Sequence, residues 1–227
     1  MRGTAILIIS AVIVVCGCTH AVRVPPRRDA RVPETPPVTG KTQMIASWYG
    51  PDFHGKLTAS GERYDMYAMT AAHKTLPFGT ILKLTNPETG VSVTVTVTDR
   101  GPFVAGRDID LSYRAAKEVG VIGPGVLAVM VQYMGRDMKY ARYVRVSESA
   151  GTSYTIQTAA YEDRQNAERL KATLEMSYTG VFIKQAAING KTYYRVRVGH
   201  YSEKEKAMSN AKRLANEGYD TFVTPND

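Results

Sequence analysis

Cysteine is nearly absent from this chain of 227 residues, which has only Cys16 and Cys18, close to the N-terminus. Every later residue lacks a thiol partner, which excludes a disulfide-rich scaffold and a cysteine-based zinc module. Basic blocks are missing too, because the formal net charge of +8 is spread along the chain. Such a spread lacks the clustered footprint of a nucleic-acid reader, so we predict no nucleic-acid partner. With 44% hydrophobic residues, the chain can bury the core of one large domain or two small ones.

The N-terminus has the pattern of an export signal. Its apolar run from Ala5 to Val15 is shorter than the roughly 20 residues that span a membrane, but it suits a secretory signal. The residues 15–18, Val-Cys-Gly-Cys, resemble the lipobox of bacterial lipoproteins. We therefore predict a signal peptide over 1–17 and a lipid anchor on Cys18, with a signal cleaved without lipidation as the alternative. Thr19 stands where Asp usually retains such lipoproteins in the inner membrane, which implies the outer membrane, facing the periplasm.

Two polar segments divide the rest of the chain. Residues 19–41 are rich in Pro and Arg and hold almost no large apolar residue, so we expect an extended tether. A second polar break begins at Ser147. The predicted organisation is a lipidated Cys and tether over 18–41, a first domain over 42–146, a linker over 147–151 and a second domain over 152–227.

Strand patterns dominate the first domain. From Val91 to Asp99, valine alternates with serine or threonine, which is the period of a half-buried strand. Residues 81–85 match it as a partner, and the turn residues 86–90 make the two a hairpin. Because Gly and Pro soon follow it, Asp99 is presented where the strand ends.

The remaining pattern indicates short strands, including 44–49 and 126–133. One helix is expected from the capping residue Ser112 to Val119, closed by Gly120. A small closed barrel is the fold that best accounts for several short strands with one helix.

Five motifs in this domain resemble the rare lipoprotein A family. They are ASWYG at 46–50, FHGKLTASGERYD at 53–65, AAHKTLPFGT at 71–80, DRGPF at 99–103 and IDLSYRAA at 109–116. Members of that family are described as septal lytic transglycosylases of peptidoglycan built on a double-psi β-barrel. The resemblance therefore implies a six-stranded barrel of this type and cleavage of MurNAc-GlcNAc glycan strands, with strands lacking stem peptides as the expected substrate.

The chemistry of such an enzyme needs a single carboxyl group. This group protonates the glycosidic oxygen and then takes the proton of the sugar's own C6 hydroxyl, which closes an anhydro ring. We predict neither a cofactor nor a metal. The second carboxylate of a hydrolase is not required.

Three residues match the family's functional positions: Glu62, His73 and Asp99. We assign Asp99 as the acid and base because it ends a strand, with a turn-capping Asp as the alternative. Glu62 is expected to raise the pKa of Asp99 or to orient the sugar, unless it is a solvated loop residue. His73 is expected to hydrogen-bond the carboxylate or an N-acetyl group, unless its role is structural.

Three further residues of the first domain are candidates for substrate contacts. Asp110 precedes the expected helix, although that position also suits a capping residue. Trp48 and Tyr49 suit stacking on sugar faces, although core packing would use them equally well.

The second domain has the order strand, helix, strand, strand, helix, strand. We expect these elements over 154–158, 164–176, 181–185, 193–198, 204–217 and 221–224. Asn189-Gly190 is a hairpin signal between the middle strands. This order predicts a ferredoxin-like βαββαβ domain, a four-stranded antiparallel sheet with both helices on one face.

Two segments, 154–161 and 194–201, resemble the half-motifs of SPOR domains, which bind glycan stripped of stem peptides at division septa. Alternation directs Ile156, Val196 and Val198 toward the helices. The open face is then expected to be lined by Thr155, Gln157, Tyr193, Arg195 and Arg197, and the last four are predicted to bind the glycan. A solvated sheet without a ligand remains the alternative.

These features predict peptidoglycan as the partner and enrichment of the protein at the septum. The septal location also allows division proteins as partners. A second function class stays open, in which the protein binds or loosens glycan without cleaving it, as an expansin-like factor or scaffold would.

Overall fold

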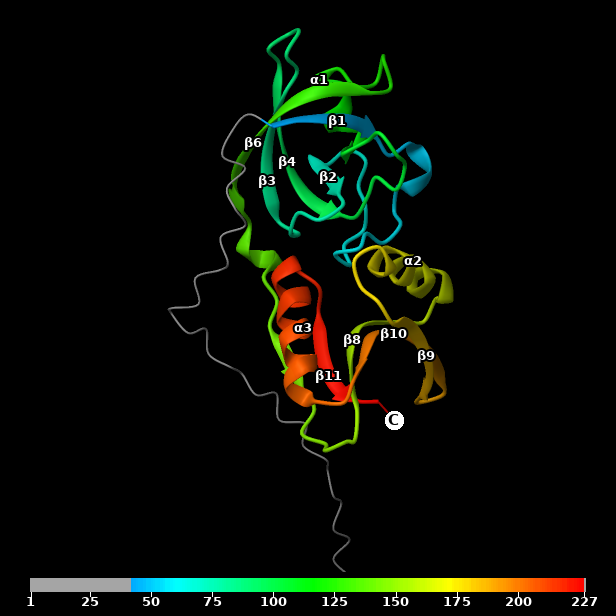
Figure 1. Cartoon of the computed structure of the whole chain (residues 1–227). Helices are drawn as coiled ribbons and strands as arrows, with labels where there is room; N and C mark the ends of the chain where they lie inside the picture. The colour runs from blue at the N-terminus through cyan, green and yellow to red at the C-terminus, as the bar shows by residue number, and fades with distance from the viewer. Residues whose placement is uncertain (1–41, 227) are drawn as a thin grey trace, which may run out of the picture.

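Six strands close into a barrel in the computed structural model, which describes residues 42–226 (Figure 1). They are β1 (Thr42–Trp48), β2 (Thr70–His73), β3 (Thr80–Thr85), β4 (Ser92–Asp99), β5 (Ile109–Leu111) and β6 (Leu127–Arg136). Around the barrel the order is β1-β5-β2-β4-β3-β6, with β1 parallel to β5 and β2 parallel to β4. The predicted double-psi β-barrel is thus confirmed. The predicted signal peptide, Cys18 and the tether lie outside the described residues.

The hairpin of β3 and β4 follows the alternation of its sequence. Val93, Val95 and Val97 fill the barrel interior at 5% exposure or less, whereas Ser92 and Thr94 are exposed. The turn is held by Asn86, whose Oδ1 accepts the backbone N–H of Glu88 at 2.9 Å. Valine on one face and hydroxyl residues on the other therefore set the register of the barrel wall.

One α-helix, α1 (Tyr113–Val119), covers the barrel. The Ser112 hydroxyl accepts the backbone N–H of Ala115 at 3.2 Å, and Gly120 ends the helix in the left-handed conformation with φ of 88°. The predicted helix and both its caps are confirmed. Two single 3₁₀ turns lie between the strands: η1 (Pro51–Phe53) follows β1, and η2 (Met138–Tyr140) follows β6.

The second domain carries α2 (Arg164–Glu175) and α3 (Lys204–Glu217) on one face of a sheet. Its strands are β7 (Val144–Val146), β8 (Tyr154–Tyr161), β9 (Val181–Ile188), β10 (Lys191–Tyr201) and β11 (Thr221–Pro225). Ile156, Val196 and Val198 are at most 1% exposed and pack with Leu174 and Leu214 of the helices. The predicted βαββαβ order is confirmed.

The sheet nevertheless has five strands rather than the four expected. Residues 144–146, predicted to belong to the first domain, form β7, which pairs parallel with β11 at the sheet edge. The boundary therefore lies earlier in this region than the predicted end at residue 146. A three-residue strand shows no alternation, and pairing with β11 decides where it lies.

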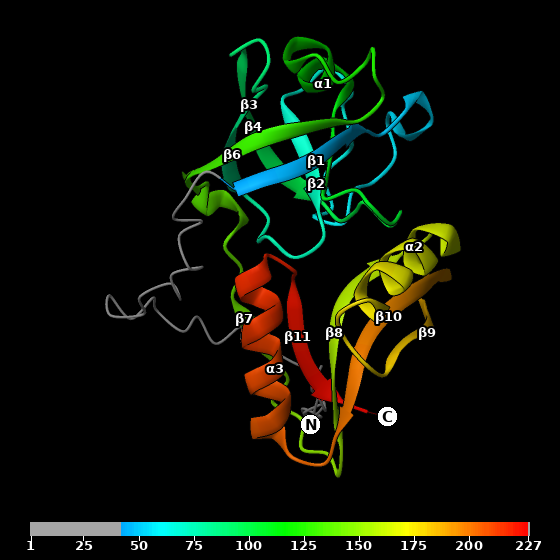
Figure 2. The same cartoon turned by 45° about the horizontal axis from the view of Figure 1, so that its top comes forward.

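The two domains are docked through a mixed aromatic and charged contact. Phe78 of the barrel is fully buried in the core of the second domain, edge-on to Tyr219 with ring centroids 5.0 Å apart. Arg100 stacks on Phe78 at 3.8 Å and lies 3.9 Å from a carboxylate oxygen of Glu217. Figure 2 shows α2 and the end of α3 turned toward the barrel. Since side chains of both domains share this core, we expect the domains to move together.

The helices of the described residues are all short. Among residues 42–226, no helix is long and apolar enough to cross a membrane.

Candidate functional site

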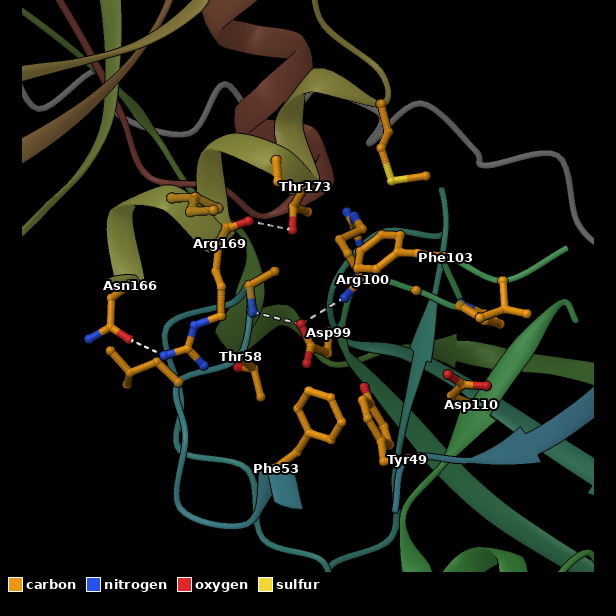
Figure 3. Close-up of a pocket in the computed structure, with 18 of the residues that line it drawn as sticks. Tyr49, Phe53, Thr58, Asp99, Arg100, Phe103, Asp110, Asn166, Arg169 and Thr173 are labelled. Atoms are coloured by element: carbon orange, nitrogen blue, oxygen red, sulfur yellow. Dashed lines mark hydrogen bonds between the residues drawn. The ribbon is translucent and has the colours of Figure 1, made fainter. Parts of the chain in front are cut away.

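Asp99 lies at the base of a cleft beside the end of β4 (Figure 3). Its backbone partner in β2 is Ala72. Its Oδ1 accepts hydrogen bonds from the backbone N–H groups of Ala59 and Arg100, both at 2.8 Å. A strand end and the loop that carries Ala59 thus hold the carboxyl group from two sides.

Burial raises the pKa of Asp99 above that of an ordinary aspartate. Its backbone donors, the Tyr49 hydroxyl and the charge of Arg100 act in the opposite direction, but burial outweighs them. The pKa of Tyr49 is itself raised well above its usual range by burial and by the charge of Asp99, so Tyr49 stays a neutral donor. A raised pKa favours the protonated form of Asp99, which is the form that general acid catalysis requires.

The cleft in front of Asp99 has a volume of about 690 Å³ and is lined by both domains. The barrel contributes aromatic and charged side chains, including Trp48, Tyr49, Phe53, Phe103 and Asp110. One face of α2 contributes Asn166, Arg169, Thr173 and, just beyond the helix, Met176. A largely apolar cleft with a few polar groups suits a sugar polymer whose ring faces are apolar and whose edges carry hydroxyls.

Asp110 of β5 lines the same cleft and is 7% exposed. Its Oδ1 accepts a hydrogen bond from the Ser47 hydroxyl, and its Oδ2 lies 3.3 Å from the guanidinium of Arg107. Arg107 compensates the charge of Asp110, and the Ser47 hydroxyl fixes the orientation of the carboxylate. The structure therefore brings both Asp residues predicted for the site into one cleft.

Trp48 and Tyr49 also line the cleft, as a role in substrate binding requires. Trp48 packs edge-on against Tyr113 with centroids 5.8 Å apart, and Tyr49 lies 4.7 Å from the ring of Tyr64. These contacts fix the orientation of the two rings.

His73 ends β2 but does not line the cleft. Its Nδ1 accepts the backbone N–H groups of Thr75 at 3.2 Å and Leu76 at 3.0 Å, so this nitrogen carries no proton. Burial, and then the charge of Arg100, lower the pKa of His73 to about 4, which leaves the ring neutral at neutral pH. Within residues 42–226 no hydrogen bond joins His73 to Asp99. Its backbone contacts fit the alternative of a structural role, and a contact with the substrate stays a prediction.

Glu62 is an exposed loop residue that lines a second cavity of about 340 Å³. Its Oε2 accepts the Tyr140 hydroxyl at 2.6 Å, and its Oε1 lies 3.7 Å from Nζ of Lys139. The raised pKa of Asp99 comes from burial and not from a neighbouring carboxylate. The prediction that Glu62 raises this pKa is therefore unsupported, and orienting the sugar stays its predicted role.

The open sheet face differs in part from the prediction. Gln157, Tyr193 and Arg195 are partly exposed there, but Arg197 is 2% exposed and Thr155 is fully buried. The prediction that the last two are exposed is wrong, because alternation along a strand assigns a side chain to a face but does not show how far that face is covered. The Thr155 hydroxyl is itself engaged with the Val198 carbonyl at 3.3 Å.

The contribution of α2 to the cleft was not predicted from the sequence. A signal was present, since Asn166, Arg169, Thr173 and Met176 recur at intervals of three or four residues and form one stripe. The core of the second domain uses a different stripe, Ala167, Leu170 and Leu174. The sequence pattern does not show that this stripe faces the barrel across the cleft.

Comparisons with known proteins divide the chain in the same way. A family described as lytic transglycolase matches residues 41–131, and the SPOR domain family matches residues 150–225. The chain is 36% identical over 176 residues to the endolytic peptidoglycan transglycosylase RlpA of Vibrio cholerae, covering 78% of this chain and 65% of the relative. It is 32% identical over 237 residues to the protein of the same name from Pseudomonas aeruginosa, covering 79% of this chain and 70% of the relative. The solved RlpA SPOR domain from P. aeruginosa is 27% identical, with a TM-score of 0.28, and covers 31% of this chain and 96% of that one.

Proposed function

The chain belongs to the RlpA family, and from this premise we propose that its barrel is an endolytic lytic transglycosylase of peptidoglycan with Asp99 as the acid and base. The chain spans about two thirds of the length of these relatives. The observation that carries the proposal is the position of Asp99, a carboxyl group of raised pKa at the base of a cleft lined by aromatic rings.

In the proposed reaction, protonated Asp99 donates its proton to the oxygen that links two sugars. The bond from C1 to that oxygen breaks, and the adjacent Asp99 carboxylate stabilises the positive charge that develops on C1 and the ring oxygen. The C6 hydroxyl of the same muramyl sugar then attacks C1 and returns its proton to Asp99. The products are a strand with a free hydroxyl and a strand with an anhydro-muramyl end, and Asp99 is protonated again.

Two neighbours of Asp99 assist these steps. Tyr49 stays a neutral phenol beside the carboxylate, so it stabilises the ionised form by hydrogen bonding between the two proton transfers. The Asp110 carboxylate is held at the cleft by Arg107 and by the Ser47 hydroxyl, which suits it to accept hydrogen bonds from sugar hydroxyls.

Digestion of peptide-free peptidoglycan strands, followed by mass analysis of the products, tests the proposed reaction. We expect fragments of many lengths whose new ends are each lighter by one water than a hydrolysed end. Reducing ends would instead make the protein a hydrolase, in which a second carboxylate such as Asp110 activates water. No cleavage at all would favour a protein that binds glycan without cutting it.

We further propose that the second domain targets peptide-free glycan at the septum through Gln157, Tyr193 and Arg195 on its open face. Arg195→Glu should then weaken binding of the full chain to peptide-free sacculi. Lys212→Glu is a matched control, because Lys212 is an exposed residue of α3 on the other side of the sheet. Equal binding by both variants would contradict targeting by the sheet.

The lipid anchor, the tether and the outer-membrane location are proposals from the sequence alone. Cys18→Ala should release the chain from the membrane fraction. An unchanged distribution between membrane and soluble fractions would contradict the lipoprotein assignment.

A further inference from the structure

The cleft that holds Asp99 has two walls, and they belong to different domains. The second wall is formed by side chains of α2, among them the polar Asn166, Arg169 and Thr173, and by Met176 just beyond the helix. Figure 3 shows Arg169 extending from α2 toward the barrel loop that carries Thr58, across the cleft from its base. A substrate that reaches Asp99 therefore passes side chains of the second domain.

The position of this wall is set by the domain contact. Phe78 of the barrel is fully buried against Tyr219. Gly218, beside Tyr219, has φ of 101°, and a Cβ atom there would lie 2.9 Å from the Phe78 ring. A close fit of this kind leaves α2 little freedom to move relative to Asp99.

Three arginines line the cleft, and they differ in their partners. Arg107 pairs with Asp110 at 3.3 Å, and Arg100 lies 3.9 Å from Glu217. The third, Arg169, donates to the side-chain oxygen of Asn166 at 2.7 Å, and no carboxylate of residues 42–226 forms a salt bridge with it. Arg169 is therefore the cleft-lining arginine without a salt-bridge partner among residues 42–226, and its side chain is exposed at the wall of the cleft.

The other positively charged side chains of α2 each form a salt bridge with a glutamate of the same helix. Arg164 pairs with Glu168 at 3.2 Å and Lys171 with Glu175 at 2.6 Å, in both cases one helical turn away. The residue one turn after Arg169 is Thr173, whose hydroxyl donates to the Arg169 carbonyl at 2.9 Å. The guanidinium is thus oriented by an amide while its charge stays available to a ligand.

We infer that Arg169 binds the free lactyl carboxylate of muramyl residues and so makes the second domain part of the substrate-specificity site. This inference rests on the proposed function. A stem peptide converts the lactyl carboxylate into a neutral amide, whereas a peptide-free strand keeps the charge. Guanidinium groups bind carboxylates through paired, charge-assisted hydrogen bonds, so Arg169 distinguishes the two kinds of strand.

The test uses one preparation of peptide-free glycan strands in two chemical forms. In the first form the lactyl carboxylates are free, and in the second they are converted to methylamides. The full chain is compared with Arg169→Gln, Arg169→Lys and Arg164→Gln, the last removing a positive charge from the same helix away from the cleft.

We expect the parent to prefer the free form and Arg169→Gln to lose this preference. Its kcat/KM on free strands should fall by roughly 10-fold to 100-fold, the range of a lost hydrogen bond to a charged group, mainly through KM. Cleavage of the methylamide form should be unchanged. Arg169→Lys should keep part of the preference, and Arg164→Gln should keep all of it.

A second measurement separates this inference from the proposed function. Each charge variant is combined with Asp99→Asn, and its Kd for the two forms of glycan is measured without cleavage. A loss of preference in binding caused by Arg169→Gln supports the inference even if the parent cleaves neither form. The inference is overturned if the parent binds both forms equally, if Arg169→Gln keeps the preference, or if Arg164→Gln loses as much.

Discussion

Phe78 is the barrel residue whose removal we expect to weaken both domains. Its ring is fully buried, lies edge-on to Tyr219 at 5.0 Å and is covered by the Arg100 guanidinium at 3.8 Å. Truncating a buried Phe to Ala costs about 3–5 kcal/mol, of which the edge-on contact contributes about 0.5–1.5 kcal/mol. Phe78→Ala and Tyr219→Ala should therefore each be strongly destabilising, and the double variant should be less destabilising than their sum by about 1 kcal/mol.

Urea unfolding of these variants measures the effect, with one probe for each domain. The single tryptophan, Trp48, lies in β1 and reports on the barrel, while circular dichroism of the helices reports mainly on the second domain. We expect Tyr219→Ala, a change in the second domain, to shift the tryptophan transition of the barrel. The control is Tyr143→Ala, whose side chain is 66% exposed and should change stability by less than about 0.5 kcal/mol. A tryptophan transition that Tyr219→Ala leaves in place would refute the docking of the domains.

Three other changes have outcomes that follow from the site. Folding lowers the pKa of His73 from 6.5 to about 4, so the parent should lose roughly 3 kcal/mol of stability as pH falls from about 6.5 to about 4. Urea unfolding at each pH should show a smaller loss for His73→Asn. Tyr49 lowers the pKa of Asp99, so Tyr49→Phe should move the alkaline limb of the pH–rate profile to higher pH, and a limb that stays in place or moves down would contradict their contact. Glu62 pairs with Tyr140 and not with Asp99, so Glu62→Gln should leave the alkaline limb of the pH–rate profile unchanged. A shift of this limb would show that Glu62 does influence the pKa of Asp99.

Local sequence patterns predicted most of the elements because each has its own physical cause. Valine alternation produced β4, and the caps Ser112 and Gly120 bounded α1. Asn189 and Gly190 both adopt positive φ, as the hairpin signal requires. By contrast, β7 could not be predicted, because a strand of three residues is defined by its pairing with β11.

The candidate site was predictable in position but not in its electrostatics. Asp99 was placed correctly at a strand end, since the glycine and proline after it interrupt the strand. Its raised pKa depends on burial in a cleft that two domains form, and no local pattern contains that information. The same limit applies to Glu62, whose partner Tyr140 is 78 residues away in the chain.

The role of Asp99 is tested most directly by Asp99→Asn, measured in single turnover on peptide-free glycan strands. This change keeps the size of the side chain and its acceptor for the Ala59 and Arg100 N–H groups, but removes the transferable proton. Glu62→Gln and Asp110→Asn serve as comparison variants, since neither residue is assigned the proton transfer. We expect a fall of roughly 100-fold or more for Asp99→Asn alone, with the Kd for glycan retained. Cleavage by Asp99→Asn at near the parental rate, or a larger loss in either comparison variant, would contradict this role of Asp99.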